Sequence, residues 1–162
     1  MLFRSLRVMV GEGEAGAASE VVELRAQVDD LAGEAVPGLI AAVLAAGALD
    51  AFVTQILMKK GRTGLLITAL CEEAQRAAVG EALLRHSGSF GYRYQRVARE
   101  VLARSWEPVE TPWGSVRLKL GYLGAELVHA APEFEDCRQV AEAAGLPLAK
   151  VYAAALAARE KQ

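Results

Sequence analysis

A short acidic segment contains the first residues that could do chemistry. Asp29 and Asp30 stand side by side, and Glu34 follows shortly after them. Carboxylate oxygens are hard ligands that suit Mg²⁺ or Mn²⁺. The start of a helix predicted to follow this pair would add unpaired backbone N–H groups and the positive end of a dipole. This segment is therefore a candidate metal site with an anion beside it.

A second segment carries the opposite charge. Lys59, Lys60 and Arg62 offer positive charge, and the arginine adds a fork of donors that fits phosphate oxygens. Gly61 and Gly64 allow a close backbone approach, so that main-chain N–H groups could also face an anion. A metal would bridge the acids to a polyphosphate while the cations neutralise the rest. Each charge-assisted hydrogen bond would contribute roughly 1.5–3 kcal/mol.

Both segments also have a structural interpretation. An Asp-Asp pair before a helix commonly serves as an N-cap. A Lys-Lys-Gly-Arg stretch in a hairpin is commonly a solvated turn. The functional interpretation gains weight only if folding brings the two segments together, so the elements around them matter.

The hydrophobic pattern predicts these elements and their order. Apolar alternation and β-rich composition predict strands, and helical spacing predicts helices between them. The expected strands cover residues 21–28, 51–58, 65–71 and 92–102, and the expected helices cover 33–46 and 72–86. Strand, helix, strand, strand, helix, strand is the order of the ferredoxin-like split βαβ arrangement.

This topology predicts that three loops share one edge of the sheet. The end of the first strand, the turn between the second and third strands, and the end of the second helix all lie on the same side. The loops are residues 29–34, 59–64 and 87–91. The acidic and cationic segments are therefore expected to meet, and the third loop adds the hydroxyls of Ser87 and Ser89.

The rest of the chain predicts a smaller α+β part. We expect a hairpin around residues 111–114, a strand near 126–129, and two C-terminal helices over 133–144 and from 147 onward. The fold class is thus α+β, a ferredoxin-like βαββαβ unit followed by a hairpin, a strand and two helices. The expected division is 1–20 as an upstream remnant with a linker, 21–105, and 106–162.

Composition narrows the class of protein. The chain has 162 residues, of which 53% are hydrophobic and 23% charged, and this excludes a disordered chain. A net charge of −2 gives no general attraction to nucleic acid or to a membrane surface. No apolar run reaches a membrane-spanning length, and we expect no signal peptide. Cys71 and Cys137 form no motif, which indicates buried thiols in the cytoplasm. His86 and His129 have no metal-spaced partner, so we expect structural roles.

Longer stretches of the chain resemble the C-terminal half of the LarC nickel-insertion family. The matching stretches are VDDLAGE (28–34), AGALDAFVTQILMKKGRTG (46–64), ETPWGSVRLKL (110–120) and APEFEDCRQVAEAAGLPLAKVYAAAL (131–156). They follow the family's order and cover nearly all of residues 21–158. The earlier LRVMVGE resembles the segment that ends the family's first domain. The chain thus looks like the family's second part.

The resemblance implies a role in making the nickel-pincer cofactor. Family members insert Ni²⁺ into pyridinium-3,5-bisthiocarboxylic acid mononucleotide and depend on CTP with Mn²⁺ or Mg²⁺. The resemblance implies a lyase-type cyclometallase that needs the family's N-terminal domain for activity. It also leaves open a non-catalytic module that senses a nucleotide or drives oligomerisation. Exposed strand edges and an alanine-rich last helix favour a homo-oligomer.

The resemblance also implies roles for particular residues. The implied metal ligands are Asp29, Asp30 and Glu34. The implied contacts, either to the triphosphate or to the phosphate of the pincer cofactor, are Lys59, Lys60, Gly61, Arg62, Ser87 and Ser89. The family's Met-Ser/Thr-Pro after the Asp pair is replaced here by Leu31, Ala32 and Gly33, so a hydroxyl is lost. The acidic stretch with Glu133, Glu135 and Asp136 matches the family and leaves open metal binding or helix capping. No catalytic residue is assigned.

Overall fold

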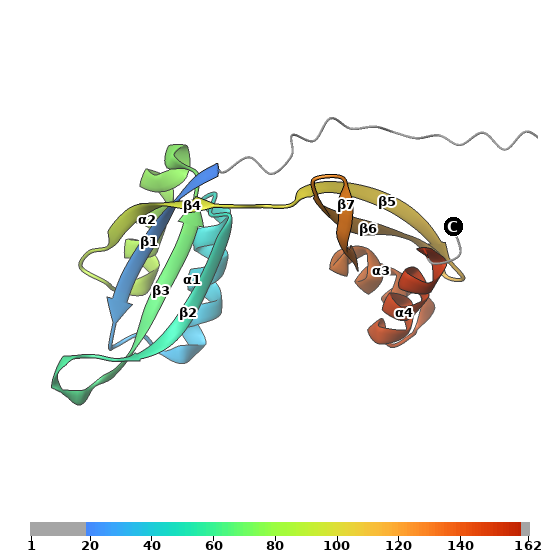
Figure 1. Ribbon diagram of the computed structural model, residues 1–162. Coiled ribbons are helices and arrows are strands. Elements are labelled where there is room, and N and C mark those ends of the chain that lie inside the picture. The colour runs from blue at the N-terminus through green and yellow to red at the C-terminus, as the bar shows by residue number, and fades with distance from the viewer. Residues whose placement is uncertain (1–18, 160–162) are drawn as a thin grey trace, which may run out of the picture. The chain divides into compact units, whose positions relative to one another are not determined.

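The computed structural model describes residues 19–159. These residues form two compact units that divide between Arg99 and Glu100 (Figure 1). This division comes earlier than the boundary expected after residue 105, because the strand that begins at Ala103 pairs entirely within the second unit. Most of the expected linker over residues 1–20 lies outside the described residues; Ser19 and Glu20 already belong to the first strand.

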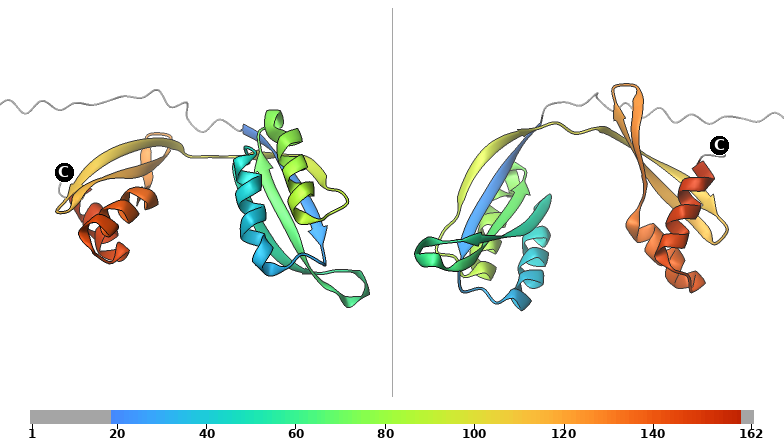
Figure 2. Two further views of the ribbon diagram at one scale, coloured as in Figure 1. Left: turned by 180° about the vertical axis from the view of Figure 1, so that it is seen from behind. Right: turned by 60° about the horizontal axis from the view of Figure 1, so that its bottom comes forward.

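The first unit is the expected ferredoxin-like fold. Its elements are β1 (Ser19–Val28), η1 (Gly33–Ala35), α1 (Val36–Ala45), β2 (Asp50–Leu57), η2 (Lys59–Gly61), β3 (Thr63–Cys71), η3 (Glu73–Gln75), α2 (Arg76–Ser87) and β4 (Arg93–Arg99). The strands form an antiparallel sheet in the order β2-β3-β1-β4. Helices α1 and α2 cover the same face of this sheet (Figure 2, left). The predicted α+β class and βαββαβ order are confirmed.

Alternation along β1 builds the core of this unit. Val22, Leu24, Ala26 and Val28 are buried, whereas the residues between them point to the opposite face. Side chains of α1 and α2 pack against this apolar row; the largest are Leu39, Val43, Val79 and Leu83. Since a strand alternates with period two, Glu23, Arg25 and Gln27 share the face that the helices leave open.

Several element boundaries differ from the sequence prediction, most clearly those of the first helix and the fourth strand. The helix expected over residues 33–46 begins as a short 3₁₀ turn, and α1 proper starts at Val36 with Pro37 in its first turn, where a missing N–H is tolerated. The strand expected over residues 92–102 is the shorter β4 (Arg93–Arg99), in which Arg99 pairs with Ser19, the first described residue of β1.

The second unit is a three-stranded sheet with two helices. Its elements are β5 (Ala103–Thr111), β6 (Gly114–Leu123), β7 (Glu126–Pro132), α3 (Phe134–Ala144) and α4 (Leu148–Arg159). The strands pair antiparallel in the order β5-β6-β7. The core joins Val109, Val116 and Leu118 of the sheet to Cys137 and Val151 of the helices. The predicted hairpin, strand and two C-terminal helices are confirmed.

The burial of the two cysteines and the length of the helices were also predicted from the sequence. Cys71 and Cys137 are both buried and free, as predicted, and burial raises the pKa of each thiol. In residues 19–159 no single helix is long and apolar enough to cross a membrane; α3 and α4 reach that length and character only as a pair bent by 118°.

Candidate functional site

The acidic and cationic segments meet at one edge of the first sheet. Val28 pairs with Leu65, so the end of β1 lies beside the start of β3 and the hairpin that precedes it. Nη1 of Arg62 donates to Oδ2 of Asp29 at 2.9 Å. Two segments 33 positions apart in sequence are therefore in direct contact.

The ion pair sits at the surface. The Asp29 side chain is 30% exposed and that of Arg62 is 63% exposed, so both groups are accessible to a ligand. The hydrogen bond from Arg62 lowers the pKa of Asp29 below its usual range, and the nearby charge of Lys59 acts in the same direction. Asp29 is therefore an ionised carboxylate that already has a cation beside it.

The acidic pair does not cap the following helix. The N-cap positions of η1 and α1 are Ala32 and Ala35, and neither makes a side-chain capping bond. Asp30 is exposed and makes no side-chain hydrogen bond or ion pair within residues 19–159. The structural interpretation of the Asp pair as an N-cap is therefore wrong.

The carboxylates do not form a complete metal site by themselves. Across residues 19–159, no three His, Cys, Asp or Glu side chains come close enough to share an ion, so Asp29, Asp30 and Glu34 are not such a set. Mg²⁺ usually takes one or two carboxylates and completes its shell with water and substrate phosphates. The exposed Asp29 and Asp30 fit that pattern, in which the phosphate itself supplies ligands.

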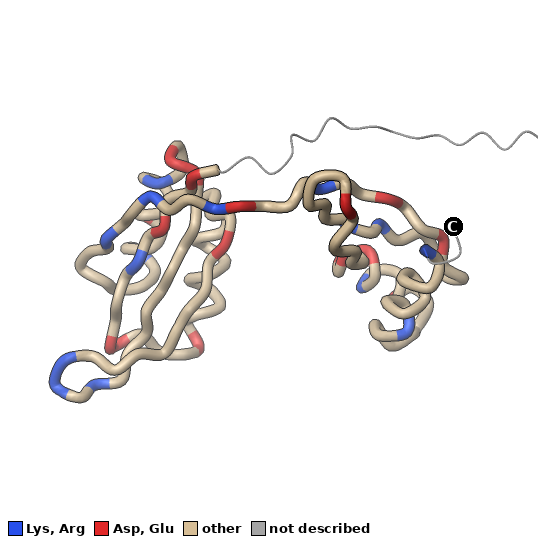
Figure 3. The backbone as a smooth tube through the Cα atoms, in the orientation of Figure 1, with Lys and Arg blue, Asp and Glu red and all other residues tan. Residues whose placement is uncertain are grey.

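Lys60, at the tip of the β2–β3 hairpin, has a left-handed backbone conformation. Lys60 has φ 63° and ψ 21°, and it is the one non-glycine residue with positive φ in the described part of the chain. Gly61 follows it at φ 69°, and Met58 N donates to Arg62 O at 2.7 Å below the tip. Figure 3 shows the tip as a run of cations, with acidic positions at the neighbouring sheet edge. Non-glycine residues in this region are uncommon and gather at functional sites.

The third loop reaches the same edge, but its hydroxyls are already used. Ser87 is 1% exposed, and its Oγ accepts a hydrogen bond from Ser89 N at 3.1 Å. Oγ of Ser89 donates to Gly91 O at 2.8 Å and lies 3.5 Å from Gln27 O, near the end of β1. The buried Ser87 hydroxyl is thus not open to a ligand in this structure. Phe90, which the sequence prediction left without a role, is fully exposed in this loop.

Asp29 lines an open groove of about 570 Å³, together with residues on both sides of the hairpin. Most of its lining is apolar, and the polar groups are few, as in small-molecule sites of this size. It is lined by Val28, Asp29, Leu31, Gly33, Gln55, Ile56, Leu57, Thr63, Gly64 and Leu65. A Cβ on Gly64 would lie 2.6 Å from Val28 O and would also collide with the Met58 side chain, so this position of the groove lining has no room for a side chain.

Sequence reasoning missed two polar residues of this groove. Gln55 and Thr63 lie on β2 and β3 and offer an amide and a hydroxyl beside the apolar lining. Alternation along β2 places Gln55 on the same face as Ala51 and Val53, which pack against the core, and this parity was a signal that could have found it. The β2–β3 register places Gln55 opposite Leu65, and this pairing depends on segments that are distant in sequence.

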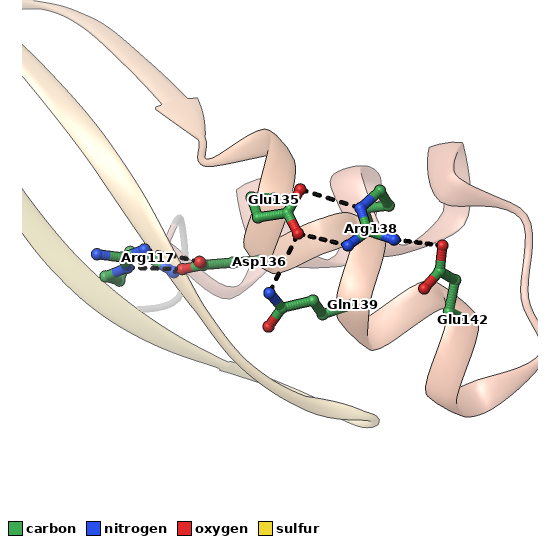
Figure 4. Close-up of polar contacts among 6 residues, drawn as sticks. All are labelled: Arg117, Glu135, Asp136, Arg138, Gln139 and Glu142. Carbon is green, nitrogen blue, oxygen red and sulfur yellow. Dashed lines mark hydrogen bonds and ion pairs between the residues drawn. The ribbon is translucent and has the colours of Figure 1, made fainter. Parts of the chain in front are cut away.

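The acidic stretch of the second unit has structural partners instead of a metal. Asp136 accepts from Arg117 Nε at 2.8 Å and from Arg117 N at 3.0 Å (Figure 4). Trp106 Nε1 donates to Glu133 at 2.8 Å, and Glu133, at the N-cap of α3, makes no capping bond. The structure thus supports neither metal binding nor side-chain capping, the two alternatives left open for this stretch. Glu133 and Asp136 instead bond to Trp106 and Arg117 and so join α3 to the sheet.

Glu135 belongs to a network along α3 itself. It accepts hydrogen bonds from Arg138 and Gln139, and Arg138 also pairs with Glu142 (Figure 4). The hydrogen bonds from Arg138, followed by that from Gln139, lower the pKa of Glu135 to about 2. Its charge is thus compensated within the helix.

The sequence matches a known family over nearly its whole length. The family model described as nickel insertion protein matches residues 2–152. A nickel insertion protein of Myxococcus xanthus is 47% identical over 94% of this chain and 39% of its own length. The pyridinium-3,5-bisthiocarboxylic acid mononucleotide nickel insertion protein of Akkermansia muciniphila is 40% identical over 88% of this chain and 36% of its own length. The chain thus spans less than half the length of these relatives.

A solved structure matches the fold as well. It is LarC2 in the apo form, the C-terminal domain of a cyclometallase involved in the synthesis of the NPN cofactor of lactate racemase. The TM-score is 0.82 at 33% sequence identity, and the match covers 89% of this chain and 99% of that one. With the family model matching most of the chain, the chain belongs to the LarC family of nickel insertion proteins.

Proposed function

We propose that this chain binds CTP together with Mn²⁺ or Mg²⁺ as the C-terminal part of a nickel insertion enzyme. The enzyme would insert Ni²⁺ into pyridinium-3,5-bisthiocarboxylic acid mononucleotide, the compound in the name of the Akkermansia relative. The observation that supports the nucleotide site is the contact between Asp29 and Arg62. The carboxylate of Asp29 would bind the metal, and the neighbouring guanidinium of Arg62 would donate hydrogen bonds to a phosphate. The choice of cytosine comes from the family resemblance.

Binding would exchange the partners of the ion pair. Arg62 would turn from Asp29 to a phosphate oxygen, and the freed carboxylate would take the metal together with Asp30. The metal would supply positive charge against the triphosphate. Lys59 and Lys60 would neutralise the remaining phosphate charge from the exposed hairpin tip. Glu34 is also exposed and close in sequence, and would act through a metal-bound water.

The groove beside Asp29 would hold the nucleoside. Its apolar walls would cover the base and ribose, while Gln55 and Thr63 would bond to polar edges. Gly61 would allow the phosphates to approach the backbone of the turn. Ser89 would keep the third loop at the edge of the site by its bonds to Gly91 and Gln27.

Nickel is a substrate in this proposal, and the two thiols are not assigned to it. Cys71 and Cys137 are buried with raised pKa, which keeps them protonated and poor as metal ligands. Nickel transfer would then need the part of the relatives that this chain does not span. Self-association and a cytoplasmic location stay predictions from the sequence.

Calorimetric titration of CTP with and without Mn²⁺ tests the site directly. Wild type should bind CTP in a metal-dependent way, and Asp29→Ala/Asp30→Ala should weaken that binding by about tenfold or more. Glu126→Ala, which removes an exposed carboxylate of the second unit, is the matched control and should bind like wild type. Full metal-dependent binding by the double variant would refute the ligand assignment.

A further inference from the structure

The open face of the first sheet carries two arginines in direct register. Arg25 of β1 pairs with Arg93 of β4, so the two residues lie opposite each other on adjacent strands. Directly opposed residues in such a pair have Cβ atoms about 4.5–5.5 Å apart, and like charges there are destabilising. Both arginines line the same two adjoining hollows, of about 320 and 160 Å³, which places their side chains on one face.

The local acid cannot compensate both cations. Glu23 accepts from Arg25 Nη2 at 2.8 Å and from Gln95 Nε2 at 2.8 Å, so its two oxygens are both engaged. Arg93 makes no side-chain hydrogen bond or ion pair within residues 19–159. Arg25 Nε is buried and has no partner in that part of the chain either. Glu23 therefore compensates Arg25 alone, and Arg93 and the Nε donor of Arg25 are left without a partner in the described residues.

The surroundings of this pair suit an oxyanion. Gln27, Gly91 and Tyr92 also line the larger hollow, and Gln27 adds a side-chain amide beside the two arginines. Guanidinium forks bind phosphate oxygens with strong, directed hydrogen bonds. The two oxygens of a carboxylate accept the paired N–H donors of one guanidinium group. A tetrahedral phosphate has more oxygens and can accept such pairs of hydrogen bonds from two guanidinium groups at once. The ligand that relieves this arrangement is thus a phosphate.

This face is separate from the groove proposed for the nucleotide. Val28, which lines that groove, points to the helix-covered face of β1, whereas Arg25 and Gln27 point to the open one. Arg25 also lies four residues before Asp29 on the extended chain, or about 13 Å along the strand. The two clusters therefore belong to different sites of the same unit.

We propose that Arg25 and Arg93 form a second anion site, which binds a phosphate monoester on the open face of the sheet. This site is independent of the CTP and metal site, and it does not rest on the proposed function. The phosphate bridges the two guanidinium groups and removes the repulsion between them. Its binding therefore stabilises the first unit.

Titration of the whole chain with inorganic phosphate and with ribose 5-phosphate tests the site. Wild type should bind both, and Arg93→Gln should weaken both by about tenfold or more, since one fork is lost. Arg93→Lys keeps the charge but loses the paired guanidinium donors, so its phosphate affinity should lie between those of wild type and Arg93→Gln. The matched control is Arg104→Gln, an exposed arginine of β5, which should bind like wild type.

Thermal melting separates a ligand site from a structural role. In phosphate-free buffer of low ionic strength, Arg93→Gln should melt at or above the wild-type temperature because the like-charge pair is gone. Phosphate should raise the melting temperature of wild type but not of this variant. Unchanged phosphate affinity in Arg93→Gln, or a lower melting temperature in phosphate-free buffer, would overturn the proposal. Equal loss of phosphate binding in Arg62→Gln would overturn it too, since the anion would then occupy the hairpin site.

Discussion

At the scale of single residues, Arg62 has two competing partners. In this structure it holds Asp29 at 2.9 Å, and in the proposed complex it would hold a phosphate. The ion pair is exposed, so it is weak enough to be displaced by a multivalent ligand. It keeps the charge of Asp29 compensated until the ligand arrives.

Substitution of Arg62 should therefore act in opposite directions on two ligands. Arg62→Gln frees Asp29, so Mn²⁺ alone should bind about two- to fivefold more tightly, as measured by electron paramagnetic resonance. The same change removes a phosphate donor, so CTP with Mn²⁺ should bind about tenfold more weakly by calorimetry. Arg85→Gln breaks another exposed ion pair of the first unit and should change neither. Loss of both affinities in Arg62→Gln would contradict the exchange of partners.

Lys60 offers a second test at this scale. Asparagine tolerates the left-handed backbone at this position better than lysine, so Lys60→Asn should leave stability equal or raise it by up to about 1 kcal/mol. It should also weaken CTP binding because a cation is lost. Lys59 has no positive φ, so Lys59→Asn should weaken CTP without any gain in the urea midpoint. A Lys60→Asn variant that is less stable would show that the lysine serves the fold.

At the scale of elements, strand ends and turns decide what the site contains. The β1–β3 pairing brings Asp29 beside the hairpin, and the β2–β3 pairing opens the groove at Gly64. Strand positions with no room for a side chain often mark a close backbone approach. Gly64 is such a position, with Met58 and Val28 both within 3 Å of an added Cβ.

Gly64→Ala should thus harm both fold and binding. The added methyl meets the backbone oxygen of Val28, so a cost of about 1–3 kcal/mol is expected in urea unfolding. CTP should also bind more weakly, since the groove narrows at this end. Gly33→Ala is the matched control, because Gly33 lines the same groove and has nothing within 4 Å of its added Cβ. If Gly64→Ala and Gly33→Ala unfold at the same urea concentration, β3 must move to accommodate the added methyl group, and the predicted clash would be refuted.

The acidic network of α3 should make the second unit sensitive to acid. The pKa of Glu135 is lowered to about 2 by Arg138, and that of Asp136 is lowered by Arg117. Groups with depressed pKa stabilise the folded state above their unfolded pKa, and this stabilisation is lost as pH falls. Stability should therefore decline from about pH 4.5 toward pH 2.

Unfolding by urea across this pH range, followed by tryptophan fluorescence, measures the decline. Trp106 and Trp113 both lie in the second unit, so the signal reports on it. Glu135→Gln/Asp136→Asn should flatten the decline, and Glu126→Gln should not. An unchanged decline in the double variant would show that other groups govern acid unfolding.

At the scale of the whole molecule, the chain corresponds to one part of its longer relatives. It matches 39% of the Myxococcus relative but 99% of the solved LarC2 chain. The residues of the proposed nucleotide site and of the proposed anion site all belong to the first unit, and no ligand role is proposed for the second unit. Nickel chemistry would then depend on the part of the relatives outside the match.

The chain alone should bind CTP with Mn²⁺ but should not insert nickel. Addition of the N-terminal part of the Myxococcus protein should restore insertion, because that part would supply the nickel-handling groups. Mass spectrometry of the mononucleotide product, with and without CTP, measures the reaction. In the mixture, Asp29→Ala/Asp30→Ala should abolish the dependence of nickel insertion on CTP. Nickel insertion by the chain alone would contradict the assignment of nickel handling to the N-terminal part.

The sequence by itself determined the order of the elements and the two charged segments. Alternation along β1 and helical spacing in α1 and α2 are local patterns, so the ferredoxin-like topology and the meeting of three loops could be predicted. The class of chemistry at the Asp pair and the Lys-Lys-Gly-Arg turn also followed from residue types.

Only the tertiary structure decided how individual side chains are used. The burial of Ser87, the Arg117 partner of Asp136, and the register that opposes Arg25 to Arg93 all depend on contacts between distant segments. Such contacts depend on how strands pair and helices pack, which no local period encodes. A shift of one residue in β4 would turn Arg93 to the other face of the sheet, and the second anion site would not exist.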